Sequence, residues 1–359
     1  MKKYMFIVPS FGSGGAERAV VNLSSQLAID GASVTVVIYF SMPNEYHIDS
    51  KVSVINLSGG DEAQYNRIPY LKKINKLRNI VKSEQPDYIL PFLPQVTIHA
   101  SLACFDMHKR IIYTLRNNPR FTPDNKVKRF ICNMLICTSW KTIVQNERQR
   151  AFYPQIFQSK MHILFNPVSN ELFSIQEKNS SRLKTIIGVG RLEKQKNFAM
   201  LIRAVGKILV EYPDVQLKIY GEGVERNNLQ DLIDNLSLEE HVHLMGRSSD
   251  MLTVYQNADL YVLSSDFEGM PNTLIEAMAA GLPCIATNCE TGPSDLIQDN
   301  CNGLLIDVGN EQQLVNAIQI MIKSPENAAV MGKRAKITVR EKCGIESIAA
   351  RLRDICNEL

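Results

Sequence analysis

The residues best placed to do chemistry are two carboxylates eight positions apart, Glu268 and Glu276. An apolar run from Ala258 to Leu263 precedes them and predicts a short buried strand, and Gly281 with Pro283 predicts the end of a helix. Eight residues span just over two helical turns, so a carboxylate in the loop and one on the helix can face the same cleft. A solvated loop residue and a helix salt bridge also explain this spacing, which arises by chance in most chains of this size, so the pair alone does not establish a site.

The turn between the two glutamates predicts an anion-binding site. Backbone N–H groups at a helix start and the positive end of the helix dipole attract anions such as phosphate. A phosphate held there would have a carboxylate on either side, which matches the ribose, diphosphate and sugar of a nucleotide sugar. The residues of this turn are Gly269, Met270, Pro271, Asn272 and Thr273.

A second segment carries two cations five positions apart, Arg191 and Lys196, after a predicted strand. The planar fork of an arginine and the mobile charge of a lysine can both reach one diphosphate. Two histidines at i and i+2, His241 and His243, share a strand face. No third ligand is in view, so we expect surface or packing side chains and no metal site. The chain contains no Asp-x-Asp motif.

In their order along the chain, these segments resemble the retaining glycosyltransferases of the GT-B fold, in particular the large family 4. The resemblance covers nearly the whole chain. It rests on Phe267-Glu268-Gly269-Met270-Pro271 with Glu276, on Gly188-Val189-Gly190-Arg191-Leu192 with Lys196-Asn197, and on the Gly14-Gly15 turn after the first strand. It implies an α/β fold, GT-B, in which two Rossmann-like doubly wound domains face a cleft.

The resemblance implies a role for each candidate residue. Glu268 would orient or electrostatically support the donor sugar, and Glu276 would bind ribose hydroxyls. Arg191 and Lys196 would neutralise the leaving diphosphate. The other implied contacts are Gly14 and Gly15 near the donor diphosphate, Gly246 and Arg247 near the base, and Gly269 to Thr273 around the phosphate.

One departure from the family concerns Arg116 and Asn117. They stand at the end of a predicted strand, where many relatives carry a histidine that touches the transferred sugar. Polar residues at the carboxyl end of a parallel strand point into the ligand crevice of a doubly wound sheet. An exposed polar loop explains the same residues, and both interpretations remain open.

The implied reaction moves a sugar, an N-acetylhexosamine or hexose, from a UDP-sugar to a hydroxyl, with retention at the anomeric carbon and without metal or cofactor. The implied acceptor is a lipid-linked glycan in bacterial surface polysaccharide synthesis. Two alternatives on the same fold are a sugar-nucleotide 2-epimerase and a non-catalytic sugar-nucleotide-binding protein. A nucleic-acid binder is disfavoured because the basic residues are not interleaved with aromatics and the chain has one Trp.

The composition fits a two-domain globular protein of 359 residues with 45% hydrophobic and 21% charged residues. We expect an N-terminal domain over 1–170 and a nucleotide-sugar domain over 171–359, with the last helix packing back on the first domain. No run approaches the roughly 20 apolar residues of a membrane helix. The eight cysteines form no Cys-x-x-Cys pair and indicate reduced thiols in a cytoplasmic protein.

The charge is divided unevenly along the chain. Residues 1–170 carry 21 basic and 11 acidic side chains, whereas 171–359 carry 19 and 26. The basic half, and in it the amphipathic segment from Tyr70 to Lys82, is compatible with peripheral contact to an anionic membrane. A helix packed on a sheet with a solvated basic face is the competing interpretation.

Strand and helix patterns alternate through both halves. In the first half we expect a late strand over Phe130 to Thr138, followed by a helix to about Arg150. A polar stretch from Ser174 to Arg182 is the expected linker. At the end of the chain we expect helices over Glu311 to Lys323 and Ile345 to Asn357.

Overall fold

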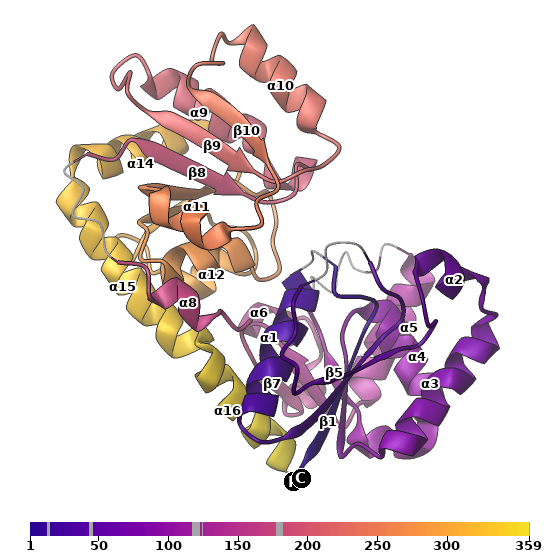
Figure 1. The fold of residues 1–359 in the computed structure, drawn as a ribbon. Helices are drawn as coiled ribbons and strands as arrows, with labels where there is room; N and C mark the ends of the chain where they lie inside the picture. Colours follow the sequence, from indigo (N-terminus) through magenta and orange to yellow (C-terminus); the bar gives the residue numbers. More distant parts are fainter. Residues whose placement is uncertain (13–14, 43–45, 117–122, 124, 177–181, 359) are drawn as a thin grey trace. The chain divides into compact units, whose positions relative to one another are not determined.

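The computed structural model describes residues 1–359 except 13–14, 43–45, 117–122, 124, 177–181 and 359. The chain divides into two compact units (Figure 1). Unit 1 contains Met1–Pro167 and Ile345–Leu359, and unit 2 contains Val168–Gly344. The first boundary thus falls three residues before the expected one, and the last helix belongs to unit 1.

Unit 1 is built on parallel strands. The order β3-β2-β1-β4 forms one sheet and β5-β6-β7 a second. A parallel bridge between Ile89 and Ile111 connects the two sheets, so the strands follow one another across the unit. The strands are β1 (Lys3–Val8), β2 (Ser33–Ile38), β3 (Ser53–Asn56), β4 (Tyr88–Pro91), β5 (Ile112–Thr114), β6 (Lys141–Val144) and β7 (Met161–Ile163).

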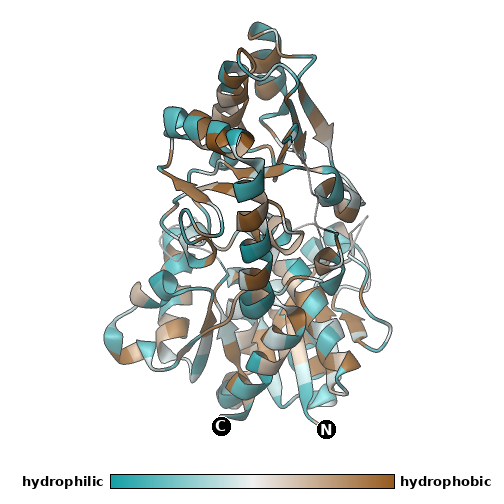
Figure 2. Ribbon diagram, turned by 90° about the vertical axis from the view of Figure 1, so that its left-hand side faces the viewer, coloured by the Kyte–Doolittle hydropathy of each residue, from teal (hydrophilic) through white to brown (hydrophobic). Residues whose placement is uncertain are grey.

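Helices cover these strands, and most carry both polar and apolar residues (Figure 2). The last helix, α16, packs against α1 and places Ile348, Ala349 and Leu352 in the same core as the β1 residue Phe6. The helices of unit 1 are α1 (Gly15–Ile29), α2 (Glu62–Arg67), α3 (Tyr70–Glu84), α4 (Pro94–Ala103), the 3-10 helix η1 (Phe105–Arg110), α5 (Lys126–Thr138), α6 (Glu147–Ala151), α7 (Gln155–Gln158) and α16 (Ile345–Asn357).

The amphipathic helix α3 uses its apolar face in the core of unit 1. Ile74, Leu77 and Val81 are buried, and they pack in one cluster with Met5 and Ile89 of the sheet. The interpretation of a packed helix with a solvated basic face therefore describes α3.

The expectation of a strand over 130–138 was wrong, because this segment belongs to helix α5. Asn125 caps the helix by accepting a hydrogen bond from the N–H of Lys128. Cys132 and Ile136 are buried one turn apart, which is the helical period. The strand is β6, which starts only at Lys141, and the predicted helix is reduced to the short α6.

Unit 2 contains one six-stranded parallel sheet of order β10-β9-β8-β11-β12-β13. The first three strands are added toward one edge and the last three toward the other, so the strand order reverses between β8 and β11. This reversal is the topological switch point at which doubly wound sheets bind ligands. The strands are β8 (Thr185–Val189), β9 (Gln216–Tyr220), β10 (Val242–Gly246), β11 (Leu260–Leu263), β12 (Cys284–Thr287) and β13 (Leu304–Ile306).

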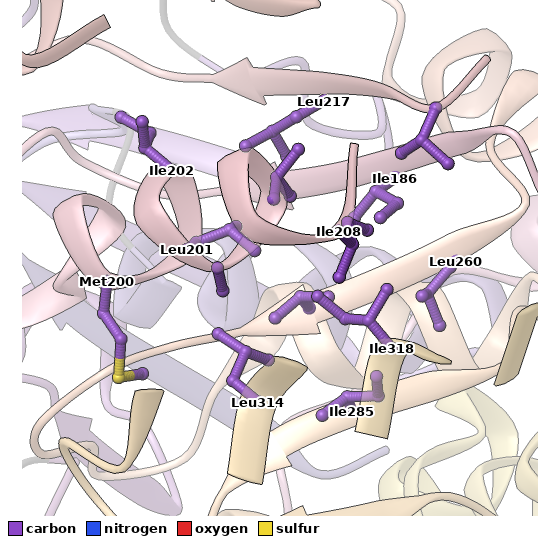
Figure 3. Close-up of a cluster of buried hydrophobic side chains, with 14 of the residues drawn as sticks. Ile186, Met200, Leu201, Ile202, Ile208, Leu217, Leu260, Ile285, Leu314 and Ile318 are labelled. Atoms are coloured by element: carbon purple, nitrogen blue, oxygen red, sulfur yellow. The ribbon is translucent and has the colours of Figure 1, made fainter. Parts of the chain in front are cut away.

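The core of unit 2 lies between its sheet and the helices α9 and α14 (Figure 3). Leu201 and Ile208 of α9 and Leu314 of α14 are fully buried against strand residues such as Ile186 and Leu217. The helices of unit 2 are α8 (Asn170–Phe173), the 3-10 helix η2 (Lys194–Lys196), α9 (Phe198–Ile208), α10 (Arg226–Asn235), α11 (Met251–Asn257), α12 (Asn272–Ala279), α13 (Pro293–Leu296), α14 (Glu311–Lys323) and α15 (Pro325–Cys343).

No helix in the described ranges combines the length and the apolar character needed to cross a bilayer. All eight cysteines are free thiols.

Candidate functional site

The switch point of unit 2 brings together the loops that follow β8 and β11. These strands are neighbours, with Leu260 opposite Ile186. The loop after β8 carries Lys196, and the loop after β11 carries Glu268. Two segments more than 70 residues apart in the sequence therefore meet at one edge of the sheet.

Lys196 and Glu268 form a buried ion pair. The Lys196 Nζ lies 2.6 Å from the Glu268 Oε1, and the two side chains are 14% and 8% exposed. The Ser265 hydroxyl donates a second hydrogen bond to the same Oε1 at 2.7 Å. A charge that is removed from water needs a partner of opposite charge, and each member of this pair supplies it to the other.

Hydrogen bonds tie the two loops to each other. The Ser264 hydroxyl donates to the backbone carbonyl of Lys196 at 2.8 Å. The N–H of Asp266 donates to the carbonyl of Gln195 at 2.8 Å, and the Asn197 amide donates to the Asp266 carboxylate at 2.8 Å. The ion pair is therefore held by the backbone on both sides.

The turn after Glu268 packs against the segment that follows β12. The Thr291 hydroxyl donates to the backbone carbonyl of Glu268. Gly292 has a φ of +98°, and a Cβ placed there would lie 2.6 Å from the Pro271 Cδ and 2.8 Å from the Gly269 carbonyl oxygen. Only glycine fits at position 292, because the backbone there has a positive φ and no space is left for a Cβ.

Helix α12 begins at Asn272, directly after this turn, and carries Glu276 on its buried side. The Tyr255 hydroxyl donates to the Glu276 Oε2 at 2.8 Å. A second buried tyrosine, Tyr261, shares a hydrogen bond of 2.7 Å with the Thr273 hydroxyl. The two glutamates of the motif are thus each fixed by a hydroxyl group, Glu268 by Ser265 and Glu276 by Tyr255.

The loops after β8, β9 and β10 also meet. The N–H of Gly221 donates to the Gly246 carbonyl at 2.8 Å, and the N–H of Leu192 donates to the Glu222 carbonyl at 3.0 Å. Arg247 is exposed beside them. The predicted base-side residues Gly246 and Arg247 therefore stand at the same edge of the sheet as the ion pair.

The two predicted cations differ in their surroundings. Whereas the Lys196 side chain is 14% exposed, the Arg191 side chain is 70% exposed and lies 2.7 Å from Glu193, a surface ion pair of little stabilising value. Arg191 is therefore free of the buried network and can exchange Glu193 for a stronger anion.

Comparisons with known proteins identify the family of the chain. The family model described as Glycosyl transferases group 1 matches residues 170–338. A protein of Haemophilus influenzae named as an uncharacterized glycosyltransferase is 30% identical over 97% of this chain and 98% of its own length. The chain belongs to the group 1 glycosyltransferases.

This glycosyltransferase also has a relative in Campylobacter jejuni that is 27% identical over 94% of both chains. That relative is named N-acetylgalactosamine-N,N'-diacetylbacillosaminyl-diphospho-undecaprenol 4-alpha-N-acetylgalactosaminyltransferase. Among solved structures, Anabaena HepE in complex with UDP-glucose superposes with a TM-score of 0.80 and 17% identity over the whole of both chains. The predicted GT-B fold is confirmed.

In unit 1 of the glycosyltransferase, two predicted residues are described. Gly15 is the first residue of α1, and Arg116 is buried two residues after β5. The predicted residues Gly14 and Asn117 lie outside the described residues. The interpretation of Arg116 as part of an exposed polar loop was wrong, because the side chain is buried.

His243 on β10 and His241 just before it are each within hydrogen-bond distance of a polar group of the neighbouring segment. His243 Nε2 lies 3.2 Å from the Gln216 amide oxygen, and His241 Nδ1 lies 3.2 Å from the Val215 carbonyl. Over the described part of the chain, no group of three or more His, Cys, Asp or Glu side chains is arranged to hold a metal ion.

Sequence reasoning missed the hydroxyl groups that fix the two glutamates. Ser265 stands inside the motif, three residues before Glu268, and its spacing could have indicated a local hydrogen bond. Tyr255 and Thr291 come from other segments, and no sequence pattern connects them to Glu276 or Glu268.

Proposed function

We propose that this glycosyltransferase transfers a hexose or N-acetylhexosamine from a UDP-sugar to a hydroxyl of a lipid-linked glycan, with retention and without a metal ion. In this proposal the transfer is a step of bacterial surface polysaccharide synthesis at the inner face of the cell membrane. The observation that carries the proposal is the buried Lys196–Glu268 pair at the switch point of unit 2.

Lys196 has the properties needed to stabilise a leaving diphosphate. Glu268 and the surrounding backbone hold the ammonium group in place, so its charge is already oriented when negative charge develops on the diphosphate. An ammonium group has three donors, and one bond to Glu268 leaves capacity for phosphate oxygens. Preorganised charge in a site shielded from water stabilises a transition state more strongly than mobile charge in solvent does.

The other candidate residues have complementary roles. The exposed Arg191 is available to bind the diphosphate, and Glu276, oriented by Tyr255, would accept hydrogen bonds from the ribose hydroxyls. The turn from Gly269 to Thr273 leads into the positive end of α12 between the two glutamates. Arg116 and Asn117 are the proposed contacts to the transferred sugar, with Gly14 and Gly15 near the diphosphate.

The named relatives support the choice of donor and acceptor. HepE is described with UDP-glucose, and the Campylobacter jejuni relative is named for a diphospho-undecaprenol acceptor. HepE shares the fold of this chain, and the Campylobacter jejuni protein is its relative in sequence. Both substrates are compatible with a site that binds a diphosphate and two sets of hydroxyl groups.

The donor is tested by adding UDP-, GDP- and ADP-sugars and UDP alone and following the melting temperature and product formation. UDP and one UDP-sugar should raise the melting temperature, and Glu276→Gln should mainly weaken this binding. Arg191→Ala should also slow transfer. Lys207→Gln, which removes a surface ion pair with Glu311 in the same unit, is the matched control.

Two results would contradict the proposal. Transfer kinetics that are unchanged in both the Glu276 and Arg191 variants would exclude the assigned site. Conversion of the UDP-sugar into its 2-epimer without any acceptor would assign the alternative epimerase activity.

We further propose that unit 1 contacts an anionic membrane surface through the outer face of α5. This helix carries three cations and no acidic residue among its 13 residues. Its apolar outer side chains recur at i, i+3, i+4 and i+7, and a helix with basic flanks and such a stripe lies favourably at a bilayer interface. The exposed apolar positions are Val127, Phe130, Ile131 and Met134.

Sedimentation with phosphatidylglycerol vesicles tests this surface. Phe130→Ser with Met134→Ser should reduce the bound fraction several-fold, because each burial of an apolar side chain contributes about 1.5–3 kcal/mol. Ile156→Ser, which removes an even more exposed apolar side chain elsewhere in unit 1, should leave binding unchanged. Equal binding by all three proteins, or none by the unmodified protein, would exclude α5 as a membrane surface.

A further inference from the structure

The side chain of Arg116 is buried at the carboxyl edge of the unit 1 strands. Its Nη1 donates one hydrogen bond, of 2.9 Å, to the Asn166 side-chain oxygen. Its guanidinium carbon lies 4.6 Å from the centre of the Phe92 ring. In the part of the chain that the structure describes, neither Nε nor Nη2 has a hydrogen-bond partner.

The described neighbours of this guanidinium, Asn166 and Phe92, are neutral. Asn166 accepts a further hydrogen bond, of 2.8 Å, from the Gln145 amide, and no carboxylate of the described residues forms an ion pair with Arg116. Burial lowers the pKa of Arg116 to about 9, which still leaves it protonated at neutral pH. Within the described ranges, Arg116 is therefore a buried positive charge without a counter-charge, which proteins avoid because of its cost in free energy.

The orientation of the free donors is informative. The Nε–H and one Nη2–H point in the same direction along one edge of the guanidinium, and this edge binds two oxygens of a phosphate or carboxylate side by side. The opposite edge carries the bond to Asn166, and the Phe92 ring supports one face. The protein thus fixes the plane of the fork and leaves unpaired the edge that recognises oxyanions.

Arg116 and the side chains around it come from successive strand ends. Phe92 follows β4, Arg116 follows β5, Gln145 follows β6 and Asn166 follows β7. The carboxyl ends of parallel strands form the ligand-binding edge of a doubly wound sheet. The fork therefore stands where the fold of unit 1 binds ligands.

We propose that Arg116 binds an oxyanion of a substrate through its Nε and Nη2 edge, with Asn166, Gln145 and Phe92 as positioning residues. This inference rests on the proposed glycosyl transfer and refines the sugar-side role of Arg116. The oxyanion has two possible sources, the diphosphate of the donor and a phosphate of the acceptor. Both nitrogens are buried, so an entering anion has to displace the groups that cover them, and the pairing of a buried charge offsets that displacement.

Calorimetric titration distinguishes the two sources. The first arm measures UDP affinity of the unmodified protein, Arg116→Gln and Arg116→Lys. The second arm adds inorganic pyrophosphate to each protein after saturation with UDP, so that the cations of unit 2 are already occupied. Arg110→Gln is the matched control. Arg110 lies just before β5, at the end opposite to Arg116, and donates a hydrogen bond to the Pro86 carbonyl.

If the oxyanion belongs to the donor, Arg116→Gln should weaken UDP binding at least tenfold. If it belongs to the acceptor, Arg116→Gln should leave UDP binding unchanged and weaken pyrophosphate binding to the UDP-saturated protein at least tenfold. Arg116→Lys should restore only part of either affinity, because it keeps the charge and loses the fork. Equal affinities of the unmodified protein and Arg116→Gln for both UDP and pyrophosphate would overturn the inference.

Failure of this inference is separable from failure of the proposed function. If UDP binds and depends on Lys196 but not on Arg116, and pyrophosphate binding is also unaffected, only the fork is excluded. If UDP does not bind the unmodified protein, the donor assignment fails. Pyrophosphate binding without UDP, compared between Lys196→Gln and Arg116→Gln, then still tests the fork.

Discussion

Each unit places a cation that is largely removed from water at the carboxyl edge of its parallel strands, and the two cations differ in their partners. Lys196 in unit 2 has a carboxylate 2.6 Å away, whereas among the described residues Arg116 in unit 1 has the neutral Asn166 and an aromatic ring as partners. A compensated cation is stable by itself and can stay in position through a reaction. An uncompensated one gains most when an anion arrives, so the comparison favours a fixed charge in unit 2 and supports the anion-binding role that we propose for Arg116 in unit 1.

The largest expected effect follows the loss of the fixed charge. Lys196→Gln should reduce kcat/KM about 10²–10³-fold, since removing one preorganised group that stabilises developing charge typically costs this much. Steady-state kinetics with the UDP-sugar selected by the thermal-shift panel measure the loss. A rate within threefold of that of Lys207→Gln would show that the buried ammonium does not act on the leaving group.

The stability of each unit should respond in opposite ways to removal of its cation. Lys196→Met leaves Glu268 buried without its partner and should destabilise unit 2 by about 3–5 kcal/mol. Arg116→Met removes a charge without a counter-charge and should leave unit 1 unchanged or more stable by about 1 kcal/mol. Amide hydrogen exchange reports the two units separately, in β8 and in β5. Destabilisation of unit 1 by several kcal/mol in Arg116→Met would contradict the comparison.

The stability of unit 1 should also depend on pH, through His99. This buried side chain of α4 lies 3.1 Å from the Tyr39 hydroxyl, and burial, with Lys73 and Lys128 nearby, lowers its pKa to about 4. The unfolded chain binds the proton at about pH 6.5, so unit 1 should lose on the order of 2 kcal/mol as the pH falls from 6.5 to 4. His99→Gln should flatten this part of the pH–stability curve, as denaturant unfolding at several pH values would reveal. The same slope in both proteins would assign the acid sensitivity to other groups.

The smallest effect concerns the second glutamate of unit 2. Tyr255→Phe removes the hydroxyl that orients Glu276, and UDP should bind about threefold to tenfold more weakly, since one such hydrogen bond contributes roughly 1 kcal/mol. Tyr212→Phe, which removes an exposed hydrogen bond to Glu211, is the control for calorimetry. Equal affinities in the two variants would mean that Glu276 needs no support from Tyr255.

Much of this architecture was predictable because local patterns determine it. The alternation of short apolar runs with helical segments predicted parallel sheets, and the glycine and proline signals around Glu268 and Gly281 predicted the turn and the end of α12. Strand order is not a local property, however. The ion pair of Lys196 with Glu268 exists because β8 and β11 are neighbours, and no pattern within either strand specifies that pairing.

The wrong prediction for 130–138 and the missed helix α15 have physical causes as well. The segment 130–138 contains successive apolar residues that suit a buried strand, but Asn125 caps a helix there and only Cys132 and Ile136 on one side are buried. Helix α15 was not predicted, and its small buried residues Ala328, Gly332 and Ala335 give a weak apolar signal. Gly332 lies against α12's end, where a Cβ would be 2.2 Å from the Gly281 carbonyl oxygen, a constraint that is visible only in three dimensions.

A crystal structure with UDP tests the central assignment most directly. The account predicts the diphosphate within hydrogen-bond distance of the Lys196 Nζ, at the switch point between β8 and β11, and the ribose hydroxyls on Glu276. A diphosphate bound away from Lys196, with the ribose out of reach of Glu276, would contradict it.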